Sequence, residues 1–128
     1  MNQHYRRFSL DYFLDCQVKA GFQNIELWCG ASHFWIDSKG HEDCGPLKKK
    51  LRERGLKVVS VCTPSCAYQY QYASQEKEIL KESFNYFSNG IRVAAELGQT
   101  GLWSTPAGVT RMRTWTTCGN AVRTICML

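Results

Sequence analysis

The hydrophobic and polar positions of the first hundred residues follow two alternating periods. Apolar residues recur at helical spacing in three segments, and between these segments two shorter ones have the spacing and β-branched composition of strands. The predicted helices cover residues 9–20, 43–54 and 75–97. The predicted strands cover residues 24–29 and 57–62. A glycine follows each predicted helix, as is common where helices end, at Gly21, Gly55 and Gly98.

Alternation of helices and strands with short links predicts an α/β fold with a parallel sheet. The strand over 57–62, K-V-V-S-V-C, is nearly all apolar, as expected for a parallel strand covered on both faces. The loops that follow the strands are long and aromatic, whereas the loops that precede them are short. This asymmetry is typical of a (β/α) barrel, in which the working face lies at the carboxyl ends of the strands.

The strand over 24–29, N-I-E-L-W-C, carries the candidate site. Its alternation places Glu26 and Trp28 on one face and three apolar residues on the other. In a doubly covered sheet, a glutamate near the carboxyl end of a strand lies where ligands bind, and His33 follows closely enough to reach the same place. An edge strand with a solvated Glu26 explains the same pattern, and the residues alone leave both interpretations open.

The last segment, 101–128, differs in composition from the rest of the chain. It holds three of the 16 Lys and Arg residues, none of the 11 Asp and Glu residues, and no clear period of either kind. One interpretation is a basic extension without structure, and a second is a segment translated out of frame.

The genetic code tests the second interpretation. We read the third base of each codon together with the first two bases of the next codon, starting at Gly101. The codons of this shifted frame permit the sequence L-V-V-N-S-G-W-G-Y. That sequence would form an apolar strand followed by a glycine-rich loop. Trp115 and Thr116 force an aspartate in that frame, and codons there permit D-E-D-V-D-D-V-W-E-R-S. We therefore favour a lost base near 99–101.

Composition restricts the class of protein further. The chain has 128 residues, 44% hydrophobic and 21% charged, which is ordinary for one globular domain. No apolar run approaches a membrane span, and the N-terminus lacks the apolar segment of a signal peptide. Seven cysteines without the spacing of a disulfide framework favour reduced thiols and a cytoplasmic location.

Three further patterns suggest binding sites, and each has a simpler explanation. Cys62 and Cys66 have the spacing of metal ligands, but no second pair accompanies them, which argues against structural zinc. The basic run 48–54 resembles a phosphate-binding stripe, although a solvated helix face explains it better. The tyrosines of 68–72 could stack on nucleic-acid bases. However, residues 101–128 contribute three of the five net positive charges, so the rest of the chain attracts nucleic acid only weakly.

Several segments together resemble the sugar phosphate isomerase/epimerase family, which has the xylose isomerase-like TIM-barrel fold. They are Y-R-R-F-S-L-D-Y-F-L-D, N-I-E-L-W-C-G-A-S-H-F-W, G-L-K-V-V-S-V-C-T-P and E-S-F-N-Y-F-x-x-G-I-R-V-A-A-E-L-G. Fructoselysine 3-epimerase-like members are the most similar, and Cys29 departs from their pattern, which has glycine there. Complete barrels of this kind are about twice as long as this chain. The resemblance therefore implies an incomplete (β/α)8 TIM barrel, running from its first to its third helix over 1–100, with an irregular tail over 101–128.

The resemblance implies isomerisation or epimerisation of a sugar at a carbon beside a carbonyl, through an enediolate. It implies a divalent metal, Mn²⁺ or Mg²⁺, whose ligands come from later strands of the barrel. We therefore expect no catalytic residue, metal ligand or bound cofactor in this chain, and an inactive fragment. The residues that would contact the sugar substrate are Glu26, Trp28, His33, Thr63 and Tyr68. Trp28 would stack on the sugar and His33 would donate a hydrogen bond, although packing beneath the loop explains both equally well.

Two other functions remain open. One is a small basic protein that binds nucleic acid or an acidic partner through the arginines of 101–128 and the basic run. The other is a phosphate-ester hydrolase like the DNA-repair endonucleases of the same superfamily, whose metal-binding histidines have no evident counterparts here. We expect no membrane partner.

Overall fold

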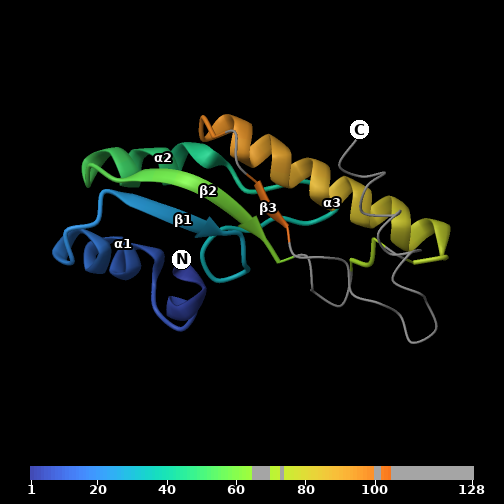
Figure 1. The fold of residues 1–128 in the computed structure, drawn as a ribbon, viewed down its shortest axis with the longest axis horizontal. Helices are drawn as coiled ribbons and strands as arrows, with labels where there is room; N and C mark the ends of the chain where they lie inside the picture. Colours follow the sequence, from blue (N-terminus) through green and yellow to red (C-terminus); the bar gives the residue numbers. More distant parts are fainter. Residues whose placement is uncertain (65–69, 73, 100–101, 105–128) are drawn as a thin grey trace.

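The computed structural model describes residues 1–64, 70–72 and 74–99, together with the backbone of 102–104, and it has the expected α/β alternation (Figure 1). A short 3-10 helix, η1, opens the chain at Asn2–Tyr5. The α-helices are α1 (Leu10–Lys19), α2 (Cys44–Glu53) and α3 (Lys77–Glu96), and the strands are β1 (Asn24–Trp28), β2 (Lys57–Thr63) and β3 (Leu102–Ser104). None of the helices in this part of the chain combines the length and apolarity needed to cross a bilayer.

The three strands form one parallel sheet in the order β1-β2-β3. The register shifts once, because Ile25 pairs with Val58 whereas Glu26 pairs with Ser60, which leaves Val59 as an extra residue on β2. Beyond this bulge the pairing is regular up to Trp28 and Cys62. Glu26, Trp28, Ser60 and Cys62 therefore lie on the same face of the sheet.

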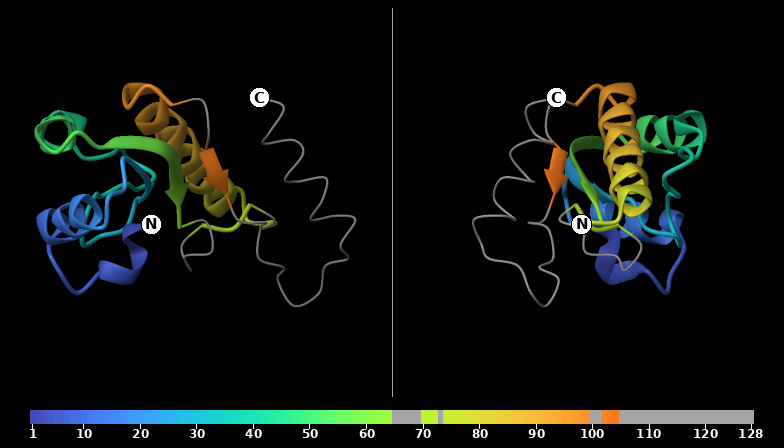
Figure 2. Two further views of the ribbon diagram at one scale, coloured as in Figure 1. Left: turned by 60° about the vertical axis from the view of Figure 1, so that its left-hand side comes forward. Right: turned by 90° about the vertical axis from the view of Figure 1, so that its right-hand side faces the viewer.

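The helices that connect the strands cover the opposite face. Figure 2 shows α2 and α3 together on one side of the sheet. Strand residues directed to that side, such as Leu27 and Val61, are fully buried and form one hydrophobic core with residues of all three helices. The face that carries Glu26 and Trp28 has no helix of the described residues against it (Figure 2).

Local signals explain where the helices begin and end. The hydroxyl of Ser9 accepts a hydrogen bond from the Tyr12 amide at 3.1 Å, and the Asp43 carboxylate accepts one from the Gly45 amide at 2.9 Å, so both residues are N-caps. Each helix is followed by a glycine whose φ is positive, between 64° and 80°, a conformation that other residues rarely adopt. Those glycines are Gly21, Gly55 and Gly98.

Most predicted boundaries lie within one residue of the observed ones, and three differences are the most informative. Helix α3 begins at Lys77 and not at residue 75, and β2 continues through Thr63, which we expected to end the strand. Residues 102–104 form β3 beside β2, although the sequence of this segment shows no strand period. The backbone pairing of an adjacent strand is sufficient to hold three residues in an extended conformation. Residues 105–128 lie outside the described part of the chain.

Candidate functional site

The candidate site lies at the carboxyl ends of β1 and β2, on the sheet face that no helix of residues 1–64, 70–72 and 74–99 covers. Glu26 and Trp28 are half-buried there, beside Ser60 and Cys62 of β2. Burial raises the pKa of the Cys62 thiol, and the nearby Glu26 carboxylate raises it further, because a second negative charge beside it is unfavourable. The structure thus brings a carboxylate, an indole, a hydroxyl and a neutral thiol onto one surface.

The indole of Trp28 lies directly against Gly30, two residues further along the chain. A Cβ atom added to Gly30 would lie 1.8 Å from an indole carbon, so only glycine leaves room for the ring. Gly30 also begins the turn that follows the strand, since its carbonyl accepts hydrogen bonds from the His33 and Phe34 amides. The glycine that we used only to mark the end of the strand therefore also determines the orientation of the aromatic side chain.

Asn2 holds Trp28 and His33 together from the outer edge of β1. Its side chain is fully buried. Its Oδ1 accepts a hydrogen bond from the Trp28 amide at 2.6 Å, and its Nδ2 donates to the Trp28 carbonyl at 2.9 Å and to His33 Nδ1 at 3.0 Å. The carboxamide thus makes the two backbone hydrogen bonds that a neighbouring strand would make at this position.

His33 is buried beneath the loop. Its Nδ1 accepts from Asn2, so its Nε2 carries the proton and donates to the Phe8 carbonyl at 2.9 Å. Both ring nitrogens therefore have protein partners. The imidazole joins the N-terminal segment to the turn after β1, which is the packing arrangement that the sequence left open.

The loop 30–42, which follows β1, is fixed at its tip by α3 and by Tyr70. Asn89 of α3 is buried and donates from Nδ2 to the Asp37 carbonyl at 2.9 Å, while the Tyr70 hydroxyl accepts from the Ser38 amide at 2.9 Å. The Tyr70 ring stacks on Tyr86 with 4.0 Å between ring centroids. These contacts therefore hold the loop in a fixed position beside the carboxyl ends of the strands.

Thr63 and Tyr68 complete the set of residues suggested by the sequence. Thr63 is buried on the helix-covered face of the sheet, because it alternates with the half-buried Cys62. Its hydroxyl has no hydrogen-bond partner among the described residues. The structure therefore does not bring its side chain to the face that carries Glu26 and Trp28. Tyr68 lies outside the described residues.

The cysteines within the described residues are free thiols, as the sequence predicted for them. Burial raises the pKa of Cys29 to about 12. Burial also raises the pKa of Cys44 to about 12, with a further contribution from the Glu96 carboxylate. These two thiols are therefore protonated and unreactive at neutral pH. No group of three His, Cys, Asp or Glu side chains in the described residues could hold a metal ion, so this part of the chain does not itself fit the metal that the resemblance implies.

The basic run 48–54 is divided by ion pairs. Lys50 and Arg54 point to α1, where Lys50 contacts Asp11 at 2.5 Å and Arg54 contacts Asp15 at 2.7 Å. The hydrogen bond from Lys50 lowers the pKa of Asp11. These contacts hold α2 against α1, so two of the five basic residues in the apparent phosphate stripe have a structural role.

Sequence reasoning did not identify Asn2 or Asn89, the two buried amides that organise the site. Each donates to a backbone carbonyl at least 26 positions away along the chain. An isolated asparagine with distant partners leaves no local pattern, so no sequence signal could have found either residue.

No protein-family model matches this chain, and no curated protein matches it.

Proposed function

We propose that this chain is part of a metal-dependent sugar or sugar-phosphate isomerase or epimerase barrel, of which it supplies one wall of the sugar pocket. Glu26 and Trp28 would contact the sugar, the indole by stacking and the carboxylate by accepting hydrogen bonds from hydroxyls. His33 would act as a positioning residue, because its ring nitrogens are already engaged. We assign no catalytic residue and derive no step through a metal.

The observation that carries this proposal is the sheet face against which no helix of the described residues packs. All three strands are parallel, the helices lie on one side, and polar side chains near the strand carboxyl ends lie on the other. In closed barrels of this type the helix-free face lines the interior, and substrates bind at the carboxyl ends of the strands. Glu26 and Trp28 occupy that location.

A second apolar stripe on α3 supports a larger barrel. Leu80, Phe84 and Ile91 are 40%, 40% and 50% exposed, and they recur at helical spacing along the helix. They lie roughly opposite the side on which Glu96 contacts His41 at 3.5 Å. A barrel helix packs against the sheet and against a neighbour on each side, and this stripe is where a following helix would pack.

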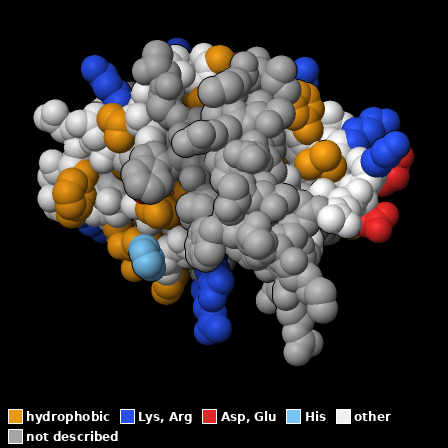
Figure 3. All heavy atoms as spheres, turned by 45° about the vertical axis from the view of Figure 1, so that its right-hand side comes forward, with side chains coloured by type: hydrophobic (Ala, Val, Ile, Leu, Met, Phe, Trp, Pro, Cys, Tyr) orange, Lys and Arg blue, Asp and Glu red, His pale blue; other side chains and the backbone are white. Residues whose placement is uncertain are grey.

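The β1 edge of the sheet also lies beside an exposed apolar residue. Within the described residues β1 has a strand partner only on its β2 side, and Asn2 provides hydrogen bonds on the other. Phe22, which precedes β1, is 58% exposed. Figure 3 shows hydrophobic side chains at several places on the surface of one face. Exposed apolar residues at both edges are expected of a sheet that continues in a complete barrel.

The alternative function, binding of nucleic acid or of an acidic partner through a basic stripe, has less support. Lys49, Lys50 and Arg54 form ion pairs with carboxylates of the same chain. Their charges are therefore partly neutralised before any phosphate approaches.

The proposal is tested first on the coding DNA and then on the protein. We expect the DNA to lack one base near codons 99–101, and restoring it should extend the chain with metal-ligating residues. The restored protein should be incubated with sugar phosphates and Mn²⁺ in heavy water. It should catalyse the exchange of the sugar proton beside the carbonyl for deuterium, which nuclear magnetic resonance detects. The 128-residue chain should not. Uninterrupted DNA, or a restored protein without proton exchange, would overturn the proposal.

Matched tryptophan variants of the restored protein test the pocket wall. Trp28→Leu should raise KM for the sugar, because the stacking surface is lost. Trp35→Leu, in the loop and directed to solvent, should leave KM unchanged. Equal effects of the two substitutions would exclude Trp28 as a sugar contact.

A further inference from the structure

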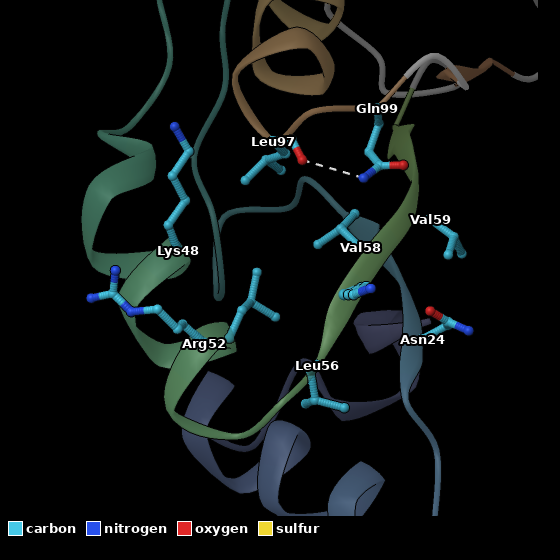
Figure 4. Close-up of a pocket in the computed structure, with 10 residues that line it drawn as sticks. Asn24, Lys48, Arg52, Leu56, Val58, Val59, Leu97 and Gln99 are labelled. Carbon is cyan, nitrogen blue, oxygen red and sulfur yellow. Dashed lines mark hydrogen bonds between the residues drawn. The ribbon is translucent and has the colours of Figure 1, made fainter.

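A cavity of about 410 Å³ lies at the opposite end of the sheet from Glu26 and Trp28. It is bordered by α2, by the start of β2 and by the residues that end α3 (Figure 4). Leu51, Leu56, Val58 and Leu97 supply its apolar walls, and the first three of these are buried. The volume is within the range of small-molecule binding sites.

Three exposed cationic side chains lie at the rim of this cavity. Lys48 and Arg52 come from consecutive turns of α2 (Figure 4). Lys57 comes from the first position of β2. No carboxylate lines the cavity. No ion pair joins any of these three cations to a carboxylate of the described residues, in contrast to Lys50 and Arg54 of the same helix.

We propose that this cavity binds a phosphate monoester with an apolar or aromatic body. Three unpaired cations match the double negative charge of a phosphate monoester better than the single charge of a carboxylate. Figure 4 shows the guanidinium of Arg52 directed outward, so this exposed side chain would turn toward the cavity to donate two parallel hydrogen bonds to phosphate oxygens, and the lysines would supply point charges at the rim. The leucine and valine side chains would cover the apolar body and remove it from water.

The site is independent of the sugar pocket proposed above. The cavity lies at the amino ends of the strands, where Asn24 begins β1 and Lys57 and Val58 begin β2. Glu26 and Trp28 lie toward the carboxyl ends. A ligand here would not touch the proposed sugar site. Binding at this cavity can therefore be found or excluded whether or not the chain belongs to an isomerase.

The test is a fluorescence titration of the full chain with naphthyl phosphate, which combines a phosphate dianion with an aromatic body. Inorganic phosphate and naphthol serve as probes of each half alone. We expect saturable binding of naphthyl phosphate that weakens as the NaCl concentration rises, and much weaker binding of both half-probes. Absence of saturable binding would overturn the proposal, and inorganic phosphate binding as tightly as the ester would overturn the role of the apolar walls.

A matched pair of double variants locates the site. Lys48→Gln with Arg52→Gln removes two charges one helical turn apart on α2 and should weaken binding of naphthyl phosphate by about tenfold or more. Lys77→Gln with Lys81→Gln removes two charges at the same spacing on the exposed side of α3 and should leave binding unchanged. Circular dichroism spectra that match the original chain show that each variant is folded. Equal weakening in both double variants would mean that only net charge attracts the probe, and would overturn the site.

Discussion

Replacing Asn2 with alanine is expected to release the outer edge of β1 at the candidate site. The carboxamide of Asn2 is fully buried and makes three hydrogen bonds, two with the Trp28 backbone and one with His33 Nδ1. Alanine removes all three and leaves the Trp28 amide and carbonyl without partners in a mostly dry location. The three α-helices and the pairing between β1 and β2 are untouched by the change.

The magnitude follows from the number of bonds lost. Each hydrogen bond contributes about 1 kcal/mol net, and groups left unpaired in a buried location add to the cost, so we expect a loss of about 3 kcal/mol. That is a large part of the stability of a small domain, which totals about 5–15 kcal/mol. Expressed as a local opening equilibrium, about 3 kcal/mol raises the exchange rate of the Trp28 amide by about 100-fold.

Hydrogen exchange measured residue by residue is the appropriate assay, and β1 provides its own reference. The Trp28 amide donates to Asn2, whereas the next amide, of Cys29, donates to the Cys62 carbonyl on the other side of the strand. In Asn2→Ala the Trp28 amide should lose protection much more than the Cys29 amide. Asn24→Ala, at an exposed asparagine of the same strand, should change neither amide. Unchanged protection of Trp28 in Asn2→Ala would refute the view that Asn2 replaces a neighbouring strand.

Four further predictions test the packing of the described residues. Gly30→Ala should displace the Trp28 indole and destabilise the fold by about 1–3 kcal/mol, visible in the near-ultraviolet circular dichroism spectrum and the urea midpoint. Cys29 and Cys44 should resist alkylation in the native chain at neutral pH and react when urea unfolds it, as followed by mass spectrometry. Because their pKa values are raised to about 12, their contribution to stability is complete below pH 9 and is lost as the pH rises toward 12, so the urea midpoint should fall over that interval. Arg54→Gln should destabilise the contact between α1 and α2 by at most about 1 kcal/mol in low salt, and by less in high salt.

The two substitutions have controls in the same chain. Gly40→Ala introduces a methyl group where no atom lies within 4 Å, so it should not alter the spectrum. Lys49→Gln removes an exposed ion pair at 4.0 Å and should leave the urea midpoint unchanged. Stoichiometric alkylation of Cys29 in the native state would show that the core is open. A Lys49→Gln effect as large as that of Arg54→Gln would show that the ion pairs to α1 have no special role.

Sequence alone was sufficient for the α/β alternation, for the three helices to within two residues at each end, and for the thiol state of the described cysteines. These features depend on local chemistry. A helix is determined by apolar spacing, by caps such as Ser9 and Asp43, and by the glycine after its last turn, all within a few residues of one another. The alternation of Glu26 and Trp28 with apolar neighbours was likewise readable, because a strand directs successive side chains to opposite faces.

Tertiary structure alone decided which of the candidate residues lie together. It placed Thr63 on the helix-covered face, used both nitrogens of His33 for internal hydrogen bonds, and divided the basic run between ion pairs with α1 and the cavity beside Lys57. It also made Asn2, at the start of the chain, a hydrogen-bonding partner of Trp28. None of these arrangements has a sequence period, because each joins residues whose separation in space is set by how the helices pack on the sheet. Buried polar groups must find partners wherever the fold brings them, and the chain order does not say where that will be.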